Sequence, residues 1–71
     1  MKKYKIPGVS IFEPTRITGL TNIEFGKNVI IDSYTFIYAN KRMKIGNNVH
    51  IASFVFLSGG DVIEIGDFVG L

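Results

Sequence analysis

The sequence predicts an all-β chain wound as a parallel β-helix, or β-solenoid, with triangular coils. Two observations lead to this fold class: a motif returns every 20 residues, and each repeat divides into three six-residue units plus two residues. The motif reads FGKNVI, IGNNVH and IGDFVG at residues 25–30, 45–50 and 65–70. Because so short a repeat cannot bury its apolar face alone, neighbouring repeats must stack.

Composition limits the classes of protein that the chain fits. Its 71 residues are 46% hydrophobic and 20% charged, which excludes a disordered segment and allows one small domain. The net charge of +2 does not indicate a nucleic-acid partner, and no apolar run approaches the roughly 18 residues of a membrane span. Residues 1–5 are basic but precede no apolar stretch, so they do not read as a signal peptide. We therefore expect a cytoplasmic protein.

The strands are predicted from the first and fifth positions of the six-residue units. Fifth positions are Val or Thr in eight units of ten, and first positions are apolar in ten of eleven, with Lys5 the exception. Each strand is therefore predicted to contain a fifth position, the residue after it and the following first position. Side chains alternate between the two faces of a strand, so the fifth- and first-position side chains face the interior and the residue between them faces outward. The apolar first positions are Ile11, Ile17, Phe25, Ile31, Ile37, Ile45, Ile51, Leu57, Ile65 and Leu71.

The second to fourth positions are predicted to be turns. They are rich in Gly and Asn, as in residues 26–28, 46–48 and 58–60, and these residue types tolerate left-handed backbone angles. Three strands and three turns per 20 residues make a triangular coil, and the coils stack as parallel ladders about 4.8 Å apart.

The two extra residues lengthen the third side of each coil, whose strands we expect at residues 21–25, 41–45 and 61–65. Their outward side chains Glu24, Lys44 and Glu64 would lie above one another with alternating charge. At the start of this side, Lys41 and Asp61 fall on inward fifth positions. An unpaired buried charge is too costly, so they either pair, swing out to solvent at the corner or contact a substrate.

The domain organisation predicted is a single partial solenoid over residues 1–71. Residues 1–10 form a cap or a degenerate start, with residues 1–4 capping or fraying, and residues 11–71 form the coils. The first 20-residue unit is irregular, as terminal repeats are. Because Leu71 opens a new unit and no capping helix follows, we expect the chain to be the N-terminal piece of a longer solenoid.

The motifs at residues 25–29, 45–52 and 63–69 resemble those of the hexapeptide-repeat acyltransferases, and the resemblance covers about residues 11–71. The nearest likeness is to the maltose, galactoside and xenobiotic acetyltransferases. It implies a left-handed coil, whereas ordinary parallel crossovers are right-handed in about 98% of cases. It also implies a homotrimer, acetyl-CoA as co-substrate and a sugar or sugar-nucleotide acceptor, acylated on oxygen or nitrogen.

His50 is the candidate catalytic residue. It is the single histidine, and it falls on an outward sixth position. In enzymes of the family that this chain resembles, a histidine acts as general base on the acceptor, and an imidazole can serve so near neutral pH. The family's usual catalytic loop lies beyond the matching coil and has no counterpart here. A surface or interface histidine is the plainer interpretation. We assign no cofactor-binding residue and no metal site, because one histidine without cysteine cannot supply zinc ligands.

Phe36 and Phe56 are expected to point outward in adjacent coils, where two aligned phenylalanines favour a covered surface such as a subunit contact. A non-catalytic assembly module, or an inactive truncated fragment, is the rival interpretation of the whole chain. Regular rows of outward Thr, which ice binding would favour, are absent.

Overall fold

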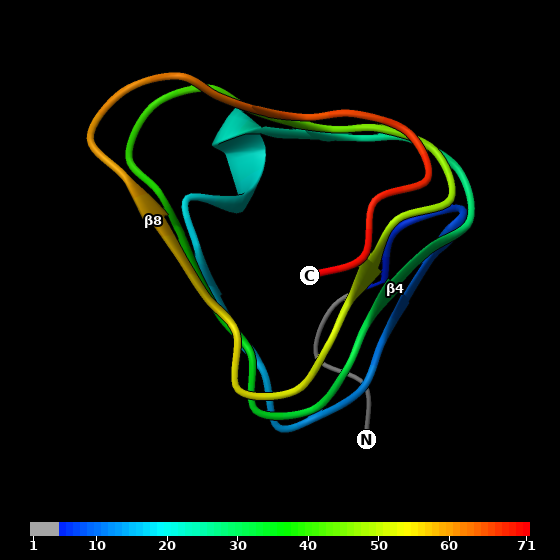
Figure 1. Cartoon of the computed structure of the whole chain (residues 1–71). Helices are drawn as coiled ribbons and strands as arrows, with labels where there is room; N and C mark the ends of the chain where they lie inside the picture. The colour runs from blue at the N-terminus through cyan, green and yellow to red at the C-terminus, as the bar shows by residue number, and fades with distance from the viewer. Residues whose placement is uncertain (1–4) are drawn as a thin grey trace.

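A computed structural model of the chain describes residues 5–71 and confirms the triangular parallel β-solenoid. The chain winds around a triangle, and successive coils lie over one another (Figure 1). The described residues form three parallel sheets of three short strands each, and each sheet takes one strand from every coil. The fold class predicted from the repeat is therefore correct.

The first sheet contains β1 (Val9–Ile11), β4 (Val29–Ile31) and β7 (His50–Ile51). The second contains β2 (Arg16–Thr18), β5 (Phe36–Ala39) and β8 (Phe56–Gly59). The third contains β3 (Ile23–Phe25), β6 (Met43–Ile45) and β9 (Ile63–Ile65). Every pairing joins residues 20 apart, as in Val9 with Val29, Ile37 with Leu57 and Ile45 with Ile65.

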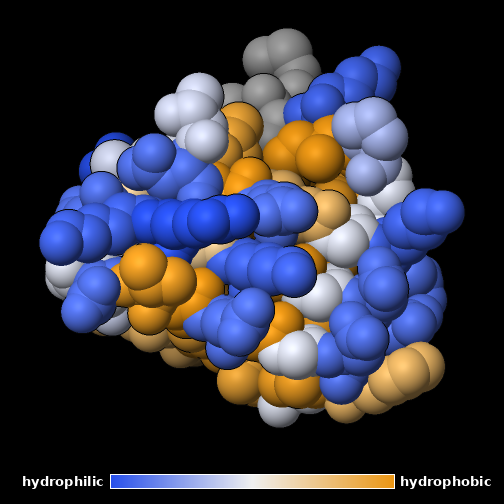
Figure 2. Space-filling view, turned by 90° about the horizontal axis from the view of Figure 1, so that it is seen from above, coloured by the Kyte–Doolittle hydropathy of each residue, from blue (hydrophilic) through white to orange (hydrophobic). Residues whose placement is uncertain are grey.

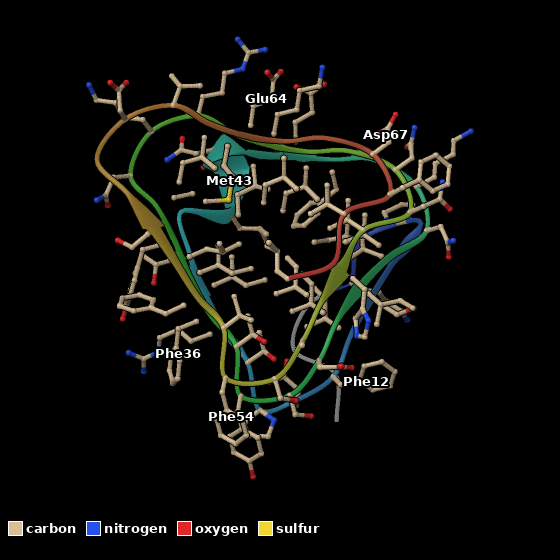
Figure 3. The ribbon with its side chains drawn as sticks, in the orientation of Figure 1. Phe12, Phe36, Met43, Phe54, Glu64 and Asp67 are labelled. Atoms are coloured by element: carbon tan, nitrogen blue, oxygen red, sulfur yellow. The ribbon has the colours of Figure 1, made fainter. Side chains whose placement is uncertain are left out.

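The core fills the centre of the triangle with the inward residues of all three sheets. Ile31, Ile37 and Ile51 are completely buried, and Met43 points into the triangle (Figure 3). Burying each such side chain contributes about 1.5–3 kcal/mol. The remaining buried apolar residues are Ile11, Ile17, Val29, Ala39, Ile45 and Val49.

Two threonines share this interior with the isoleucines. Thr35 is completely buried, and its hydroxyl lies 2.8 Å from the carbonyl oxygen of Asp32 and 3.1 Å from that of Ala52. Thr15, one coil below, lies 2.7 Å from the carbonyl of Phe12 and 3.2 Å from that of Asp32. Thr15 and Thr35 therefore link the corners of adjacent coils, which explains why a polar residue is tolerated at these two buried positions.

The corner positions adopt the left-handed backbone that the turn pattern predicts, but not always in the expected residue types. Asn28 and Asn48 have φ of 58°, and the Asn28 amide donates to Asn48 Oδ1 over 2.7 Å. Phe68 adopts the same angle in the next coil, and Tyr34 and Phe54 have φ of 65° at another corner. For an aromatic residue, this left-handed backbone conformation is less favourable by about 1–2 kcal/mol than the right-handed one.

The third side departs from the prediction at its start. Its strands begin two residues later than expected. A 3-10 turn occupies residues 20–22 before β3, and the chain bends at residues 40–41 before β6 and at residues 60–61 before β9. Lys41 and Asp61 are consequently exposed rather than inward, and the Asp61 carboxylate accepts a hydrogen bond from the Val62 N–H over 2.8 Å. Their solvation removes the cost of burying a charge. Lys5, also placed inward by the pattern, is exposed as well.

The expected column of Glu24, Lys44 and Glu64 is present in the register of the third sheet. Glu24 makes its ion pair with Arg42, at 3.7 Å between Oε1 and Nη2, with both side chains largely exposed. Figure 2 views the side that is uppermost in Figure 1, and much of this surface is hydrophilic. Such exposed pairs contribute only about 0–1 kcal/mol, so the third sheet is fixed mainly by its inward residues.

The first coil is irregular, as expected. Between β2 and β3 the chain forms a single 3-10 turn, η1 (Leu20–Asn22), which lies inside the outline of the later coils (Figure 1). Gly19, with φ of 80°, precedes this turn, and the Asn22 amide donates to the Ala39 carbonyl in the next coil over 2.7 Å. The expectation that residues 1–4 cap or fray lies outside the described residues.

Candidate functional site

The candidate base, His50, lies on the outer surface of the first sheet, as predicted. It opens β7, and both of its main-chain groups bond to the next coil: its N–H donates to the Val69 carbonyl and its carbonyl accepts from the Leu71 N–H, each over 2.9 Å. Its neighbours in the register are Ile30 below and Gly70 above. Since Gly70 has no side chain, the imidazole is open to a ligand from that direction.

The residue that orients His50 is Asp32, which the sequence analysis missed. The Asp32 Oδ2 atom lies 2.8 Å from His50 Nε2, although the two residues are 18 positions apart. When the Asp32 carboxylate is ionised it can only accept a hydrogen bond, and His50 Nε2 is then the donor. In the neutral imidazole this arrangement leaves the Nδ1 lone pair as the basic site. We call this pair the His50–Asp32 dyad.

The main chain holds Asp32 firmly. Its N–H donates to the Ile51 carbonyl over 2.9 Å, and its own carbonyl receives the hydroxyls of both Thr15 and Thr35. Its carboxylate is therefore presented from a fixed point directly after β4, while His50 begins the strand beside it. This arrangement is the geometry in which a carboxylate fixes the tautomer and direction of an imidazole.

The dyad stands on the surface of the chain rather than in an enclosed cavity. The side chains of His50 and Asp32 are 56% and 35% exposed. Phe12 and Ile30 leave apolar surface exposed on the same side of the solenoid. Among residues 5–71, two hollows lie away from the dyad: one is beside η1 and Arg42, and the other is between Pro14 and Tyr34.

The other residues singled out from the sequence do not join the dyad. Lys41 and Asp61 lie at the corner before the third sheet, and Phe36 and Phe56 lie outward on the second sheet, paired in register. Within the described part of the chain, no group of three His, Asp or Glu side chains is arranged to hold a metal ion. No helix among residues 5–71 has the length and hydropathy to cross a bilayer.

The sequence contained one usable signal for Asp32. Asp32 follows β4 by one residue and His50 lies one residue before Ile51, so the 20-residue register places them diagonally across adjacent coils. Diagonal neighbours in a sheet are within reach of long side chains. The 20-residue register alone would therefore have predicted that Asp32 lies beside His50.

Fold and site together define a triangular parallel β-solenoid that carries an exposed histidine–carboxylate dyad on one face. No family model, curated protein or solved structure matches the chain.

Proposed function

We propose that the chain belongs to an acetyl-CoA-dependent acetyltransferase acting on a hydroxyl or amine of a sugar or sugar nucleotide. The observation that carries the proposal is the His50–Asp32 dyad, which supplies a directed imidazole on an outer face of the solenoid. General bases need such an orienting partner as well as a suitable side chain. The resemblance of the repeat motifs supplies the reaction class.

In the proposed reaction, the acceptor places its hydroxyl or amine at His50 Nδ1. The imidazole takes that proton while the acceptor atom attacks the thioester carbonyl, and the Asp32 carboxylate stabilises the imidazolium through the Nε2–H. Collapse of the tetrahedral intermediate breaks the C–S bond. The departing thiolate then receives the proton from His50, which restores the neutral imidazole.

The remaining parts of the proposal rest on the same resemblance. They are the left-handed sense of the coil, a homotrimeric assembly and acetyl-CoA as co-substrate. The cytoplasmic location is proposed from composition alone. Exposure of the dyad is consistent with a site that further protein surface must close, because acyl transfer is favoured by exclusion of water.

The test is thioester cleavage from acetyl-CoA in the presence of a panel of sugars. We expect His50→Ala to reduce kcat/KM by about 10²–10⁴-fold, the usual contribution of general-base catalysis. Asp32→Asn keeps the shape of the side chain but weakens the orientation of the imidazole, so we expect a smaller loss expressed mainly in kcat. Glu64→Gln, a matched change from carboxylate to amide on the third sheet, should leave turnover unaltered.

Three results would count against the enzyme. Turnover that survives in His50→Ala removes the dyad from the reaction, and turnover lost equally in Glu64→Gln points to a general defect. A wild-type chain that cleaves no acetyl-CoA with any acceptor contradicts the proposal for this chain.

A non-catalytic assembly module is the second candidate function. The observation that favours it is the wide exposure of aromatic side chains on the second sheet and its corner. A chain that self-associates without thioester cleavage would support this alternative.

A further inference from the structure

The outer surface of the first sheet consists of two short columns of side chains. One column follows the outward positions of the strands, and ladder bonds from the residues directly after β1, β4 and β7 continue the register into the second column. We call this surface the dyad face. It consists of Ser10, Ile30, His50 and Gly70 in the first column and Phe12, Asp32 and Ala52 in the second.

An apolar pair of side chains lies one coil below the His50–Asp32 dyad. Ile30 is 20 positions before His50 and Phe12 is 20 positions before Asp32, so the two pairs occupy the same places in successive coils. Ile30 and Phe12 are 37% and 50% exposed, and Figure 3 shows Phe12 outside the ribbon, pointing away from the core. Because adjacent coils are about 4.8 Å apart, a ligand held at the dyad also covers the apolar pair.

The position of this apolar pair indicates a ligand contact. Single exposed apolar residues are ordinary on a protein surface. Apolar side chains beside a few convergent polar groups are instead typical of sites for small molecules. Ser10 and Gly70, at the two ends of the first column, are small, so Ile30 and Phe12 supply most of the apolar area of the dyad face.

The charge of the dyad face narrows the chemistry of the ligand. Asp32 contributes a carboxylate, and none of the lysines and arginines among residues 5–71 occupies a position in either column. The main-chain N–H groups of Ile30, Asp32 and His50 already donate to the next coil. A sugar nucleotide carries a diphosphate, which proteins bind through Arg, Lys or free backbone N–H groups. The dyad face therefore favours a neutral ligand over a sugar nucleotide.

A neutral pyranose ring matches both pairs of side chains. Its hydroxyl groups lie around the edge of the ring, whereas the C–H groups on its faces form apolar patches that pack against aromatic and aliphatic side chains. With one face of the ring on Phe12 and Ile30, a hydroxyl at the edge reaches the dyad in the coil above. The apolar pair then orients the sugar, and the dyad contacts the group that reacts.

We propose that the acceptor is a neutral pyranoside rather than a sugar nucleotide, and that Phe12 and Ile30 bind the apolar face of its ring while one of its hydroxyl groups contacts His50. This inference rests on the acyl transfer proposed above and narrows the class of acceptor. Sugar binding can be measured without acetyl-CoA, so the binding surface and the reaction are tested separately.

The experiment titrates methyl galactoside, methyl glucoside and UDP-glucose into the chain without acetyl-CoA and follows the chain by nuclear magnetic resonance. We expect a methyl glycoside to shift the signals of the Phe12 ring and the Ile30 methyl groups, and UDP-glucose to bind no more tightly. Phe12→Ala should raise the Kd about tenfold, whereas Phe12→Tyr, which keeps the ring, should retain binding. Phe36→Ala removes a ring of similar exposure, 46%, on the second sheet and should leave binding unaltered.

The thioester assay with a methyl glycoside as acceptor separates binding from chemistry. Phe12→Ala should raise KM by a similar factor with little change in kcat, whereas His50→Ala lowers kcat. Glycoside binding that depends on Phe12 without thioester cleavage would support the sugar-binding surface and contradict the reaction.

Three results would overturn the inference. In the first, neither glycoside shifts the signals of Phe12 and Ile30. In the second, UDP-glucose binds about tenfold or more tightly than both glycosides, which would assign the site to an anionic acceptor. In the third, acetyl-CoA shifts the same signals and neither glycoside displaces it, which would assign the apolar pair to the acyl donor.

Discussion

At the scale of single residues, the solenoid depends on a few polar groups at fifth positions, where valine stands in other units. Thr35 is completely buried, and its hydroxyl lies within hydrogen-bond distance of the carbonyl oxygens of Asp32 and Ala52, which belong to different coils. A buried carbonyl that loses its donor costs about 1–3 kcal/mol. Thr35 therefore contributes to stability through both corners and also fixes the residue that orients His50.

Thr35→Val should lower the free energy of unfolding by about 1–3 kcal/mol, because it keeps the shape of the side chain but removes the donor. Urea unfolding followed by circular dichroism measures the change. Thr18→Val, an exposed position on β2, is the matched control and should stay within about 0.5 kcal/mol of the wild type. Equal effects at both sites would show that the buried hydroxyl has no special role.

At the scale of elements, stacking brings the glycines that follow the third-sheet strands into one column. A Cβ on Gly26 would lie 2.5 Å from the carbonyl oxygen of Gly46, and one on Gly46 would lie 2.8 Å from the carbonyl carbon of Gly66. Neither glycine has a positive φ, so what requires glycine here is the close approach of the next coil rather than the backbone angle. The neighbouring ladder of side chains reinforces the contact: Asn47 accepts from the Lys27 N–H and Asp67 from the Asn47 N–H, each over 2.7 Å.

Gly46→Ala should destabilise the fold by about 1–3 kcal/mol, the usual cost of forcing a methyl group against fixed backbone. Gly66→Ala is the control within the same column, since nothing lies within 4 Å of its added Cβ. The difference between the two midpoints of thermal unfolding is the quantity to measure. If Gly46→Ala were no less stable than Gly66→Ala, the coils would not approach as closely as described.

The strands and their register could be predicted because apolar positions repeat with the period of the coil. The conformation and exposure of the corner residues were harder to predict from the sequence. Lys41 and Asp61 follow the inward pattern but are exposed, since solvation of a charge outweighs the geometry of the repeat. Tyr34 and Phe54 are not typical turn residues, so the sequence did not mark them as left-handed positions. Their stacking on each other, which offsets part of the backbone cost, depends on residues 20 apart being brought together.

At the scale of the whole molecule, winding determines which distant residues meet. The sequence identifies His50 as a single outward histidine, but the role proposed for it depends on Asp32, which is 18 positions away and is brought close by stacking of the coils. The three faces of the solenoid expose different kinds of side chain. The dyad lies on the first sheet, exposed aromatic side chains lie on the second sheet and its corner, and most charged side chains lie on the third sheet and its corners. The proposals for acyl transfer and for a neutral acceptor both rest on the face that carries the dyad.

The measurement that tests this account most directly is a set of through-space proton contacts in the nuclear magnetic resonance spectrum of the chain. A register of 20 predicts contacts between the methyl groups of Ile31 and Ile51, of Ile37 and Leu57, and of Ile45 and Ile65, one pair for each sheet. Contacts at a different spacing, or sequential amide contacts of a long helix anywhere in residues 5–71, would contradict the stacked coils and the proposals that rest on them.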